Sequence, residues 1–122
     1  MKSDKRIMIV DDMHTVLATM SNILSIHYEC ITITDPKKAL ELCNQISFDC
    51  IITDLNLDLS INVTSGIDFI DDLHSIGYQG KIIAMTGYAT KKIEARVKDK
   101  VDLFIEKPFK LMDIILWLKQ NI

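Results

Sequence analysis

The sequence predicts an α/β domain: a five-stranded parallel sheet wound on both faces by helices, in five βα units. Short β-rich runs alternate five times with segments whose apolar residues recur at helical spacing. Strands separated by helices connect through right-handed crossovers and form a parallel sheet covered on both faces. A chain of 122 residues is long enough for one core and too short for two. We therefore expect residues 1–122 to form a single domain, either complete or the N-terminal part of a longer protein.

The first half of the chain predicts two strands and two helices. Residues 6–10 are an apolar run of strand type, and residues 29–34 alternate in the manner of a partly exposed strand. Between them, an amphipathic helix would bury Met13, Val16, Leu17, Met20 and Leu24. Asp35 and Pro36 open a second helix as its N-cap and first-turn residue. The buried face of that helix would contain Ala39, Leu42, Cys43 and Ile46.

The second half predicts strands at residues 48–53, 81–85 and 101–106. A third helix begins near Gly66, ends before Gly77 and Gly80, and carries an apolar face of Ile67, Ile70 and Leu73. A fourth helix, around residues 90–98, has only a narrow apolar stripe, formed by Ala89, Ile93 and Val97. Because so little apolar surface would dock it, we expect this helix to suit a conformational switch.

The last helix follows residues 107–109 and continues to the end of the chain. Its core face would be Leu111, Ile114, Ile115 and Leu118. Three large apolar side chains lie off that face: Met112, Leu116 and Trp117. They leave an apolar flank that a second copy in a homodimer, another protein or a following domain would cover.

Composition restricts the class of protein. A net charge of −3 argues against direct nucleic-acid binding, which normally requires a basic face. Cys30, Cys43 and Cys50 are odd in number and lie inside apolar runs, so we expect buried thiols in a reducing compartment. No apolar run reaches membrane-spanning length, and no signal-peptide segment follows the charged start. We therefore expect a cytoplasmic protein without a membrane segment.

Four of the predicted strands end on residues suited to phosphoryl chemistry. The first strand is followed by Asp11 and Asp12, and the later ones by Asp54, Thr86 and Lys107. In an open parallel sheet the carboxyl ends of the strands lie along one edge, where such sheets place their sites. A carboxylate such as Asp54 can attack a phosphoryl group and hold it covalently.

The remaining groups at this edge would neutralise charge. Neighbouring carboxylates repel one another unless a cation lies among them, and a hard divalent ion such as Mg²⁺ (or Mn²⁺) prefers oxygen ligands. Lys107 supplies a positive charge for phosphate oxygens, and Thr86 supplies a hydroxyl donor. The sequence therefore predicts a site for an aspartyl phosphate.

Four motifs resemble those of response regulator receiver domains, the phospho-accepting domains of two-component signal transduction. These are Ile9-Val10-Asp11-Asp12, Ile51-Ile52-Thr53-Asp54-Leu55-Asn56, Ala84-Met85-Thr86-Gly87 and Glu106-Lys107-Pro108-Phe109, and the resemblance covers essentially the whole chain. It implies a flavodoxin-like fold with strand order 2-1-3-4-5. It also implies a signalling domain that catalyses only its own phosphorylation and dephosphorylation.

The resemblance assigns roles to individual residues. Asp54 would accept phosphate from a sensor histidine kinase, a phosphotransfer protein or a small phosphodonor such as acetyl phosphate. Asp12 and Asp54 would ligate the metal by side chain and Asn56 by its backbone carbonyl, with Asp11 helping through water. Thr86 and Lys107 would bind the phosphoryl oxygens, and the Lys107-Pro108 bond would be cis. Thr86 and the aromatic Phe104 would then change position and alter the surface offered to an effector protein or domain.

The chain departs from the family in the loop after Asp54, which is about four residues longer than usual. Leu57, Leu59, Ile61 and Val63 alternate there with polar residues, a period-2 pattern typical of an extended segment. Asp58 would add charge near the metal or turn outward. Tyr88 follows Gly87, and the resemblance implies that it flanks the approach of water, so we expect Tyr88 to modulate dephosphorylation.

Two other functions remain open at this point. One is a receiver-like scaffold that works without phosphorylation, against which the intact set of acidic residues, Thr86 and Lys107 argues. The other is an aspartyl-phosphate hydrolase, which would need a second acid two residues after the nucleophile, where this chain has Asn56. His14 is expected to be a surface residue of the first helix rather than a phosphohistidine donor.

Overall fold

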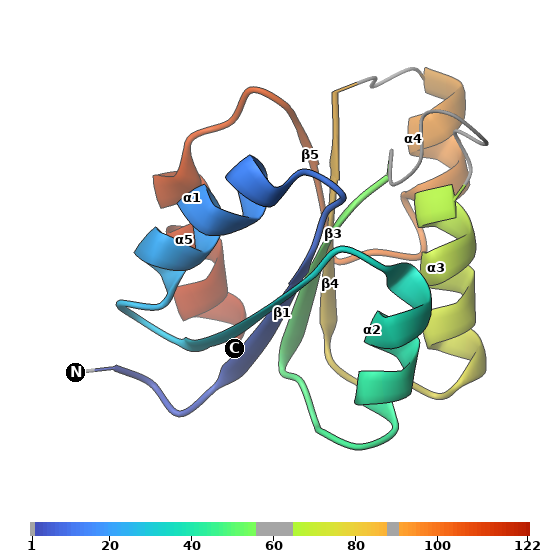
Figure 1. Ribbon diagram of the computed structural model, residues 1–122. Coiled ribbons are helices and arrows are strands. Elements are labelled where there is room, and N and C mark those ends of the chain that lie inside the picture. Colours follow the sequence, from blue (N-terminus) through green and yellow to red (C-terminus); the bar gives the residue numbers. More distant parts are fainter. Residues whose placement is uncertain (1, 56–64, 88–90) are drawn as a thin grey trace.

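The computed structural model describes residues 2–55, 65–87 and 91–122. Its centre is a five-stranded parallel sheet in the order β2-β1-β3-β4-β5 (Figure 1). The strands are β1 (Arg6–Val10), β2 (Glu29–Ile33), β3 (Cys50–Asp54), β4 (Lys81–Thr86) and β5 (Leu103–Glu106). Strand β3 is in the middle of the sheet, and its last residue, Asp54, pairs with Met85 of β4. The predicted fold class and strand order are confirmed.

Strands β3 and β5 each begin two residues later than predicted, because two aspartates occupy the start of the sheet. The Asp49 carboxylate accepts a hydrogen bond from the Arg6 amide at 2.9 Å, and the Asp102 carboxylate accepts one from the Ile82 amide at 2.8 Å. At these two positions an aspartate side chain therefore accepts the amide hydrogen bond that a carbonyl oxygen of the neighbouring strand would otherwise accept. This edge is opposite the one that carries the predicted site.

Helices cover both faces of the sheet (Figure 1). Helices α1 (His14–Leu24) and α5 (Leu111–Asn121) pack on one face, and α2 (Pro36–Cys43), α3 (Ser65–Ser75) and α4 (Lys91–Val97) on the other. Side chains alternate between the faces along each strand, so that Ile7 and Ile9 lie in the core under α1 and α5, and Met8 and Val10 in the opposite core. The two cores hold the strand ends in fixed positions.

Most of the predicted helix faces are confirmed. Leu17, Met20 and Leu24 of α1, Ile67, Ile70 and Leu73 of α3, and Ile114, Ile115 and Leu118 of α5 are buried. The Asp35 carboxylate caps α2 by accepting a hydrogen bond from the Lys37 amide at 2.9 Å, with Pro36 in the first turn. Within α4, Val97 is buried and Ile93 half-buried, as the narrow stripe predicts, and Ala89 is outside the described residues.

Three expectations about the helices are wrong. Met13 is 54% exposed, because α1 begins only at His14 and Met13 is its N-cap residue. Ile46 lies beyond the end of α2 at Cys43, although it still packs against the core. Trp117 packs half-buried against the core under α5, so the apolar flank of this helix consists of the exposed Met112 and Leu116.

Other expectations concern single residues. His14 is an exposed residue at the start of α1, as predicted. The three cysteines are free thiols, of which Cys50 is buried and Cys30 and Cys43 are half-buried. No helix among the described residues is both long enough and apolar enough to cross a membrane.

Candidate functional site

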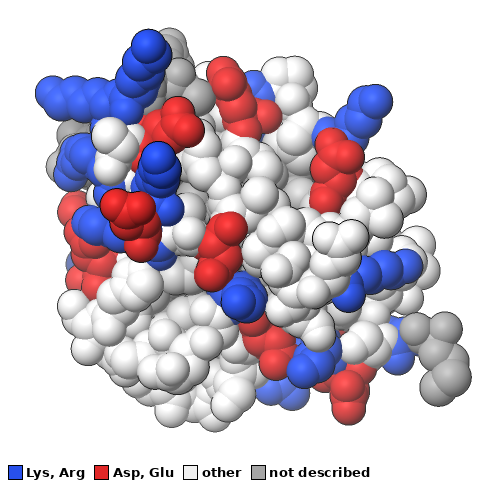
Figure 2. All heavy atoms as spheres, turned by 180° about the vertical axis from the view of Figure 1, so that it is seen from behind, with Lys and Arg blue, Asp and Glu red and all other residues white. Residues whose placement is uncertain are grey.

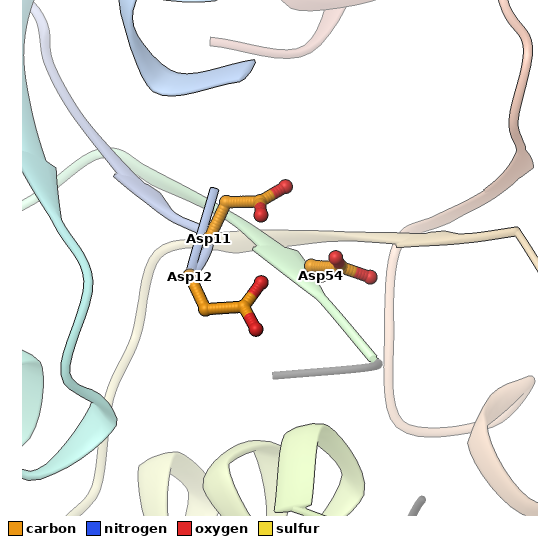
Figure 3. A group of neighbouring side chains, drawn as sticks. All are labelled: Asp11, Asp12 and Asp54. Carbon is orange, nitrogen blue, oxygen red and sulfur yellow. The ribbon is translucent and has the colours of Figure 1, made fainter. Parts of the chain in front are cut away.

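Three carboxylates meet at the carboxyl ends of β1 and β3. One side-chain oxygen each of Asp11, Asp12 and Asp54 lies within 4.8 Å of the others (Figure 3). Asp11 and Asp54 are buried, whereas Asp12 is exposed. Side chains alternate between the two faces along β1, so that Val10, its last residue, lies in a core. The chain leaves the sheet after Val10, at Asp11 and Asp12. The site is therefore open to solvent on the side of Asp12.

Lys107 projects from the end of β5 into this acidic group. Its ammonium lies 3.1 Å from Asp54 Oδ2 and 3.3 Å from Asp11 Oδ2, and it donates hydrogen bonds to both. Its side chain is 26% exposed, while the two carboxylates are almost completely buried. The Lys107 ammonium thus contacts two of the three carboxylates, those of Asp11 and Asp54.

The pKa of Lys107 reflects two opposing effects. Burial disfavours the ammonium and by itself lowers the pKa of Lys107. The charges of Asp54 and Asp11 and the hydrogen bonds to them outweigh that effect and raise the pKa above its ordinary value of 10.5. Lys107 is therefore positively charged at neutral pH and available to an anionic group.

Asp11 is held in place from two sides. Its Oδ1 accepts a hydrogen bond from the Met13 amide at 2.9 Å, and its Oδ2 accepts one from Lys107 at 3.3 Å. The first contact is an Asx-type turn between the carboxylate and the amide two residues on, which starts the approach to α1. Asp11 therefore has a fixed orientation.

Thr86 is completely buried at the end of β4, beside the end of β3. The Leu55 amide donates to the Met85 carbonyl at 2.8 Å, and the Lys107 amide donates to the Thr86 carbonyl at 2.7 Å. Backbone hydrogen bonds therefore join the segments that carry Asp54, Thr86 and Lys107. The Lys107-Pro108 peptide bond is cis, as the resemblance implies.

Gly66 is a supporting residue whose role the sequence did not reveal. A Cβ at this position would lie 2.4 Å from Leu55 Cα and 2.6 Å from the Asp54 carbonyl oxygen. Helix α3 can therefore begin directly against the backbone that carries Asp54 only because residue 66 has no side chain. The sequence shows a glycine at the start of a helix. It does not show that this glycine contacts the backbone of Leu55, eleven residues earlier in the chain.

Phe104 is outside the acidic group, on β5, where it pairs with Ala84 two residues before Thr86. It is half-buried and packs against the core under α2, α3 and α4. Asn56, Asp58 and Tyr88 are outside the described residues, as is all but the last residue of the long 57–65 loop. The structure thus brings together Asp11, Asp12, Asp54, Thr86 and Lys107.

A family model described as the response regulator receiver domain matches residues 7–119. The chain belongs to this family. Receiver domains are signalling domains, and they bind a divalent metal at an acidic pocket of the kind that Asp11, Asp12 and Asp54 form here. A comparison with curated protein sequences gave no match.

Solved structures of other receiver domains are similar. A CheY-like receiver domain from Methanospirillum hungatei is 26% identical, with a TM-score of 0.86, and the alignment covers 97% of this chain and 93% of that one. A Burkholderia pseudomallei response regulator, solved with a phosphorylated aspartic acid, calcium and citrate, is 28% identical with a TM-score of 0.82, over 97% of this receiver domain and 68% of that chain. Vibrio cholerae CheY4 (21% identity, TM-score 0.82, 98% and 100% coverage) shares the fold.

Proposed function

We propose that this receiver domain is a phospho-accepting signalling protein that takes a phosphoryl group on Asp54. The donor would be a phosphohistidine of a sensor histidine kinase or of a phosphotransfer protein, or a small phosphodonor such as acetyl phosphate. The observation that carries the proposal is the buried Asp54 carboxylate with two further carboxylates within 4.8 Å and the Lys107 ammonium at 3.1 Å. Phosphoryl transfer requires mainly positioning and charge neutralisation, and these groups supply both.

Asp54 is the best candidate for the nucleophile among the three carboxylates. Both oxygens of Asp11 already accept hydrogen bonds, from Met13 and from Lys107, so its orientation is fixed for a supporting role. Asp12 is exposed on the outer side of the group. Asp54 is on the central strand, between the strands that carry the other two acids and Thr86. A phosphoryl group there would be within the reach of all of them.

The donor set suits a hard divalent cation. Side-chain oxygens of Asp11, Asp12 and Asp54 would hold Mg²⁺ or Mn²⁺, together with the backbone carbonyl of Asn56. When bound, the ion would neutralise negative charge on the carboxylates and on the phosphoryl oxygens. The calcium ion in the Burkholderia protein supports a divalent ion in such a domain.

The proposed reaction forms one bond and breaks one. An oxygen of Asp54 attacks phosphorus, and the bond between phosphorus and the donor histidine nitrogen breaks, with its electron pair remaining on that nitrogen. Lys107 stays protonated and attracts the negatively charged phosphoryl oxygens, because its raised pKa keeps the ammonium at neutral pH. Thr86 would donate its hydroxyl to one of these oxygens.

Output would follow from a shift between two arrangements of the same fold. Phosphate adds charge and acceptor oxygens that favour the arrangement in which Thr86 and Lys107 approach Asp54. Phe104, two residues before the partner of Thr86 on β5, would turn further inward. Phe104 has no hydroxyl to bury, so the Phe104→Tyr variant should change the affinity of the unphosphorylated protein for an effector.

The wider setting is also part of the proposal. We expect residues 1–122 to act as one receiver domain in the cytoplasm, alone, in a phosphorelay or as part of a longer regulator. Its partners would be the phosphodonor protein and a downstream effector protein or domain. The exposed Met112 and Leu116 of α5 are where a second copy would pack in a homodimer.

The test is the intact mass of the protein after incubation with acetyl phosphate and Mg²⁺. We expect a gain of about 80 Da, from one phosphoryl group bound to a carboxylate nucleophile. The gain should be absent in Asp54→Asn and without divalent metal, and much slower to appear in Lys107→Ala. The matched control is Asp72→Asn, an exposed carboxylate of α3, which should react like the wild type.

Three outcomes would contradict the proposal. A protein that binds Mg²⁺ but gains no mass would be a scaffold that works without phosphorylation. Continuous release of phosphate over many turnovers, without accumulation of the adduct, would indicate an aspartyl-phosphate hydrolase. A mass gain that persists in Asp54→Asn would place the phosphoryl group on another residue.

A further inference from the structure

Helix α4 is attached to the rest of the domain by little apolar surface. Val97 is fully buried and Ile93 is half-buried, and both pack against the core under α2, α3 and α4. The other residues of the helix are exposed. Charged side chains of both signs lie close together in this region, at the left of Figure 2, where α3 and α4 of Figure 1 are seen from behind. A polar contact at the end of α4 can therefore contribute appreciably to its attachment.

Lys100 makes two contacts with α3 just after the end of α4. Its ammonium donates a hydrogen bond to the Asp71 carboxylate, with Nζ 2.7 Å from Oδ1. Its carbonyl oxygen lies 2.7 Å from His74 Nε2, and because a carbonyl oxygen can only accept, Nε2 carries the proton and donates. We call these two contacts the Lys100 brace. The Lys100 amide donates to the Val97 carbonyl at 2.8 Å, so the brace is joined directly to the last turn of α4.

Helix α3 is a firm support for this brace. Asp71 and His74 are three residues apart and therefore lie on the same side of the helix. The helix itself is fixed on the sheet by side chains that are at most 2% exposed: Ile67, Phe69, Ile70 and Leu73. At its start, the Gly66 amide donates to the carbonyl of Leu55, the residue after Asp54, at 3.2 Å. Helix α3 thus connects the backbone next to the candidate phosphoryl site with the end of α4.

The groups of the brace are open to water, which makes the contacts easy to break. The side chains of Lys100 and Asp71 are 40% and 47% exposed, and His74 is also exposed. Water can replace each partner when the contact opens, so such a contact holds a segment in place without locking it. Its loss would shift the balance between two arrangements of a weakly docked helix by up to about fivefold, the range that exposed ion pairs produce.

We propose that the Lys100 brace is an autoinhibitory contact that restrains the domain in its unphosphorylated arrangement. The inference rests on the proposed function, because it concerns the arrangement from which Asp54 is phosphorylated. A contact that is present in one arrangement and absent from the other favours the first. Helix α4, with its narrow apolar stripe, can change position at low cost. Loss of the brace should therefore raise the population of the rearranged form, and with it the rate at which Asp54 accepts phosphate.

The first measurement is hydrogen exchange of the amides of Lys98 and Lys100, which donate to Glu94 and Val97 in the last turns of α4. Lys100→Met removes the ammonium and keeps an unbranched side chain. We expect the protection of both amides to fall about threefold in this variant, as for the loss of an exposed ion pair. Asp71→Asn should have the same effect. The two changes combined should add nothing further, because each alone already breaks the contact.

The second measurement is the initial rate of mass gain at Asp54 with acetyl phosphate and Mg²⁺. We expect a rate about threefold higher in Lys100→Met and in Asp71→Asn than in the wild type, because a minority form grows by the factor by which the opposing contact weakens. NaCl screens the ion pair, so the ratio of variant to wild-type rate should fall towards one as the NaCl concentration rises. His74→Ala removes the second bond of the brace and should change both measurements in the same direction.

The chain offers a matched control in Lys81, at the start of β4. Its ammonium is 3.9 Å from the Asp102 carboxylate, and the two side chains are 43% and 39% exposed, close to the values for the brace. This pair is at the edge of the sheet opposite the candidate site, so Lys81→Met should leave both measurements at wild-type values. Lys100→Met and Asp71→Asn change the net charge in opposite directions. An equal acceleration in these two variants therefore excludes simple attraction of the anionic phosphodonor.

Three results would overturn the proposal. The first is unchanged amide protection in Lys100→Met, which would mean that the brace does not hold α4. The second is reduced protection with an unchanged rate of phosphorylation, which would mean that the brace does not restrain the rearrangement. The third is an equal acceleration in the Lys81→Met control.

Failure of this proposal is distinguishable from failure of the proposed function. A wild type that takes no phosphoryl group refutes both, whereas a wild type that reacts at the same rate as Lys100→Met refutes only the brace. Thermal unfolding shows whether each variant remains folded, and Asp71→Asn replaces Lys100→Met if that variant does not fold.

Discussion

Replacing Asp12 with Asn should stabilise the metal-free protein. Asp11, Asp12 and Asp54 have side-chain oxygens within 4.8 Å of one another, and the Lys107 ammonium offsets part of their charge. Two unit charges at that distance repel by about 0.9 kcal/mol at the dielectric constant of water, and by several times as much in a protein interior. Asp12 is exposed, so the smaller figure applies, and Lys107 cancels part of the repulsion from its two neighbours. The net gain should be about 1 kcal/mol.

The assay is thermal unfolding with EDTA and with Mg²⁺. For a domain of this size, about 1 kcal/mol corresponds to a rise in Tm of roughly 3–5 °C, so the variant should melt later than the wild type in EDTA. Mg²⁺ at ten times its Kd should stabilise the wild type by about 1.4 kcal/mol, because it binds only the folded protein. The variant should gain much less, since it has lost one ligand, and the difference in Tm should shrink or reverse.

Asp72→Asn on α3 is the control, because it also replaces one exposed carboxylate and is not part of the acidic group. It should change the Tm little in either solution. The reasoning is refuted if Asp12→Asn lowers the Tm in EDTA, since the carboxylates would then not repel one another. An equal stabilisation of variant and wild type by Mg²⁺ would remove Asp12 from the metal site.

Two further predictions concern the backbone near the site and a buried phenol. Gly66→Ala should lower the free energy of unfolding in urea by at least about 2–3 kcal/mol, since its Cβ would meet backbone atoms at 2.4–2.6 Å. Gly87→Ala, whose Cβ would have no described residue within 4 Å, should stay within about 0.5 kcal/mol of the wild type. Burial raises the pKa of Tyr78 above its ordinary value of 10.0. Above that pH the unfolded chain loses a proton that the folded protein keeps, so stability should fall, by up to about 1.4 kcal/mol per pH unit, and Tyr78→Phe should not show this loss. If the free energies of unfolding of the wild type and of Tyr78→Phe depended equally on pH between pH ~9 and pH ~11, this account of Tyr78 would be wrong.

The fold could be predicted from the sequence because local and global signals agree. Apolar runs alternate with helical spacing, Asp35 and Pro36 mark the start of α2, and the polar residues at the strand ends mark where each strand stops. The predictions that failed concern the boundaries of helices and the reach of one large side chain. Met13 has the spacing of α1 but precedes its first residue, and Trp117 is off the main face of α5 yet wide enough to reach the core. Helical periodicity predicts the direction in which a side chain points, but it does not predict how far a large side chain extends towards the core.

The residues of the candidate site could also be predicted, as a set at one edge of the sheet. Parallel strands align their carboxyl ends, so the position of each residue in its own strand places it near the others. The sequence could not give their contacts. That Lys107 contacts both Asp54 and Asp11, and that both oxygens of Asp11 are already engaged, depends on how β5 and the start of α1 lie relative to β3.

The sequence by itself thus determined the class of fold, the order of elements and the chemical groups at the sheet edge, because these follow from local periodicity and from the polarity of parallel strands. Only the tertiary structure decided which of these groups are buried and which side chains they contact. The approach of Gly66 to the Asp54 backbone and the ion pair of Lys100 with Asp71 both arise from contacts between segments distant in sequence. Such contacts depend on the packing of the whole chain, and no local pattern encodes them.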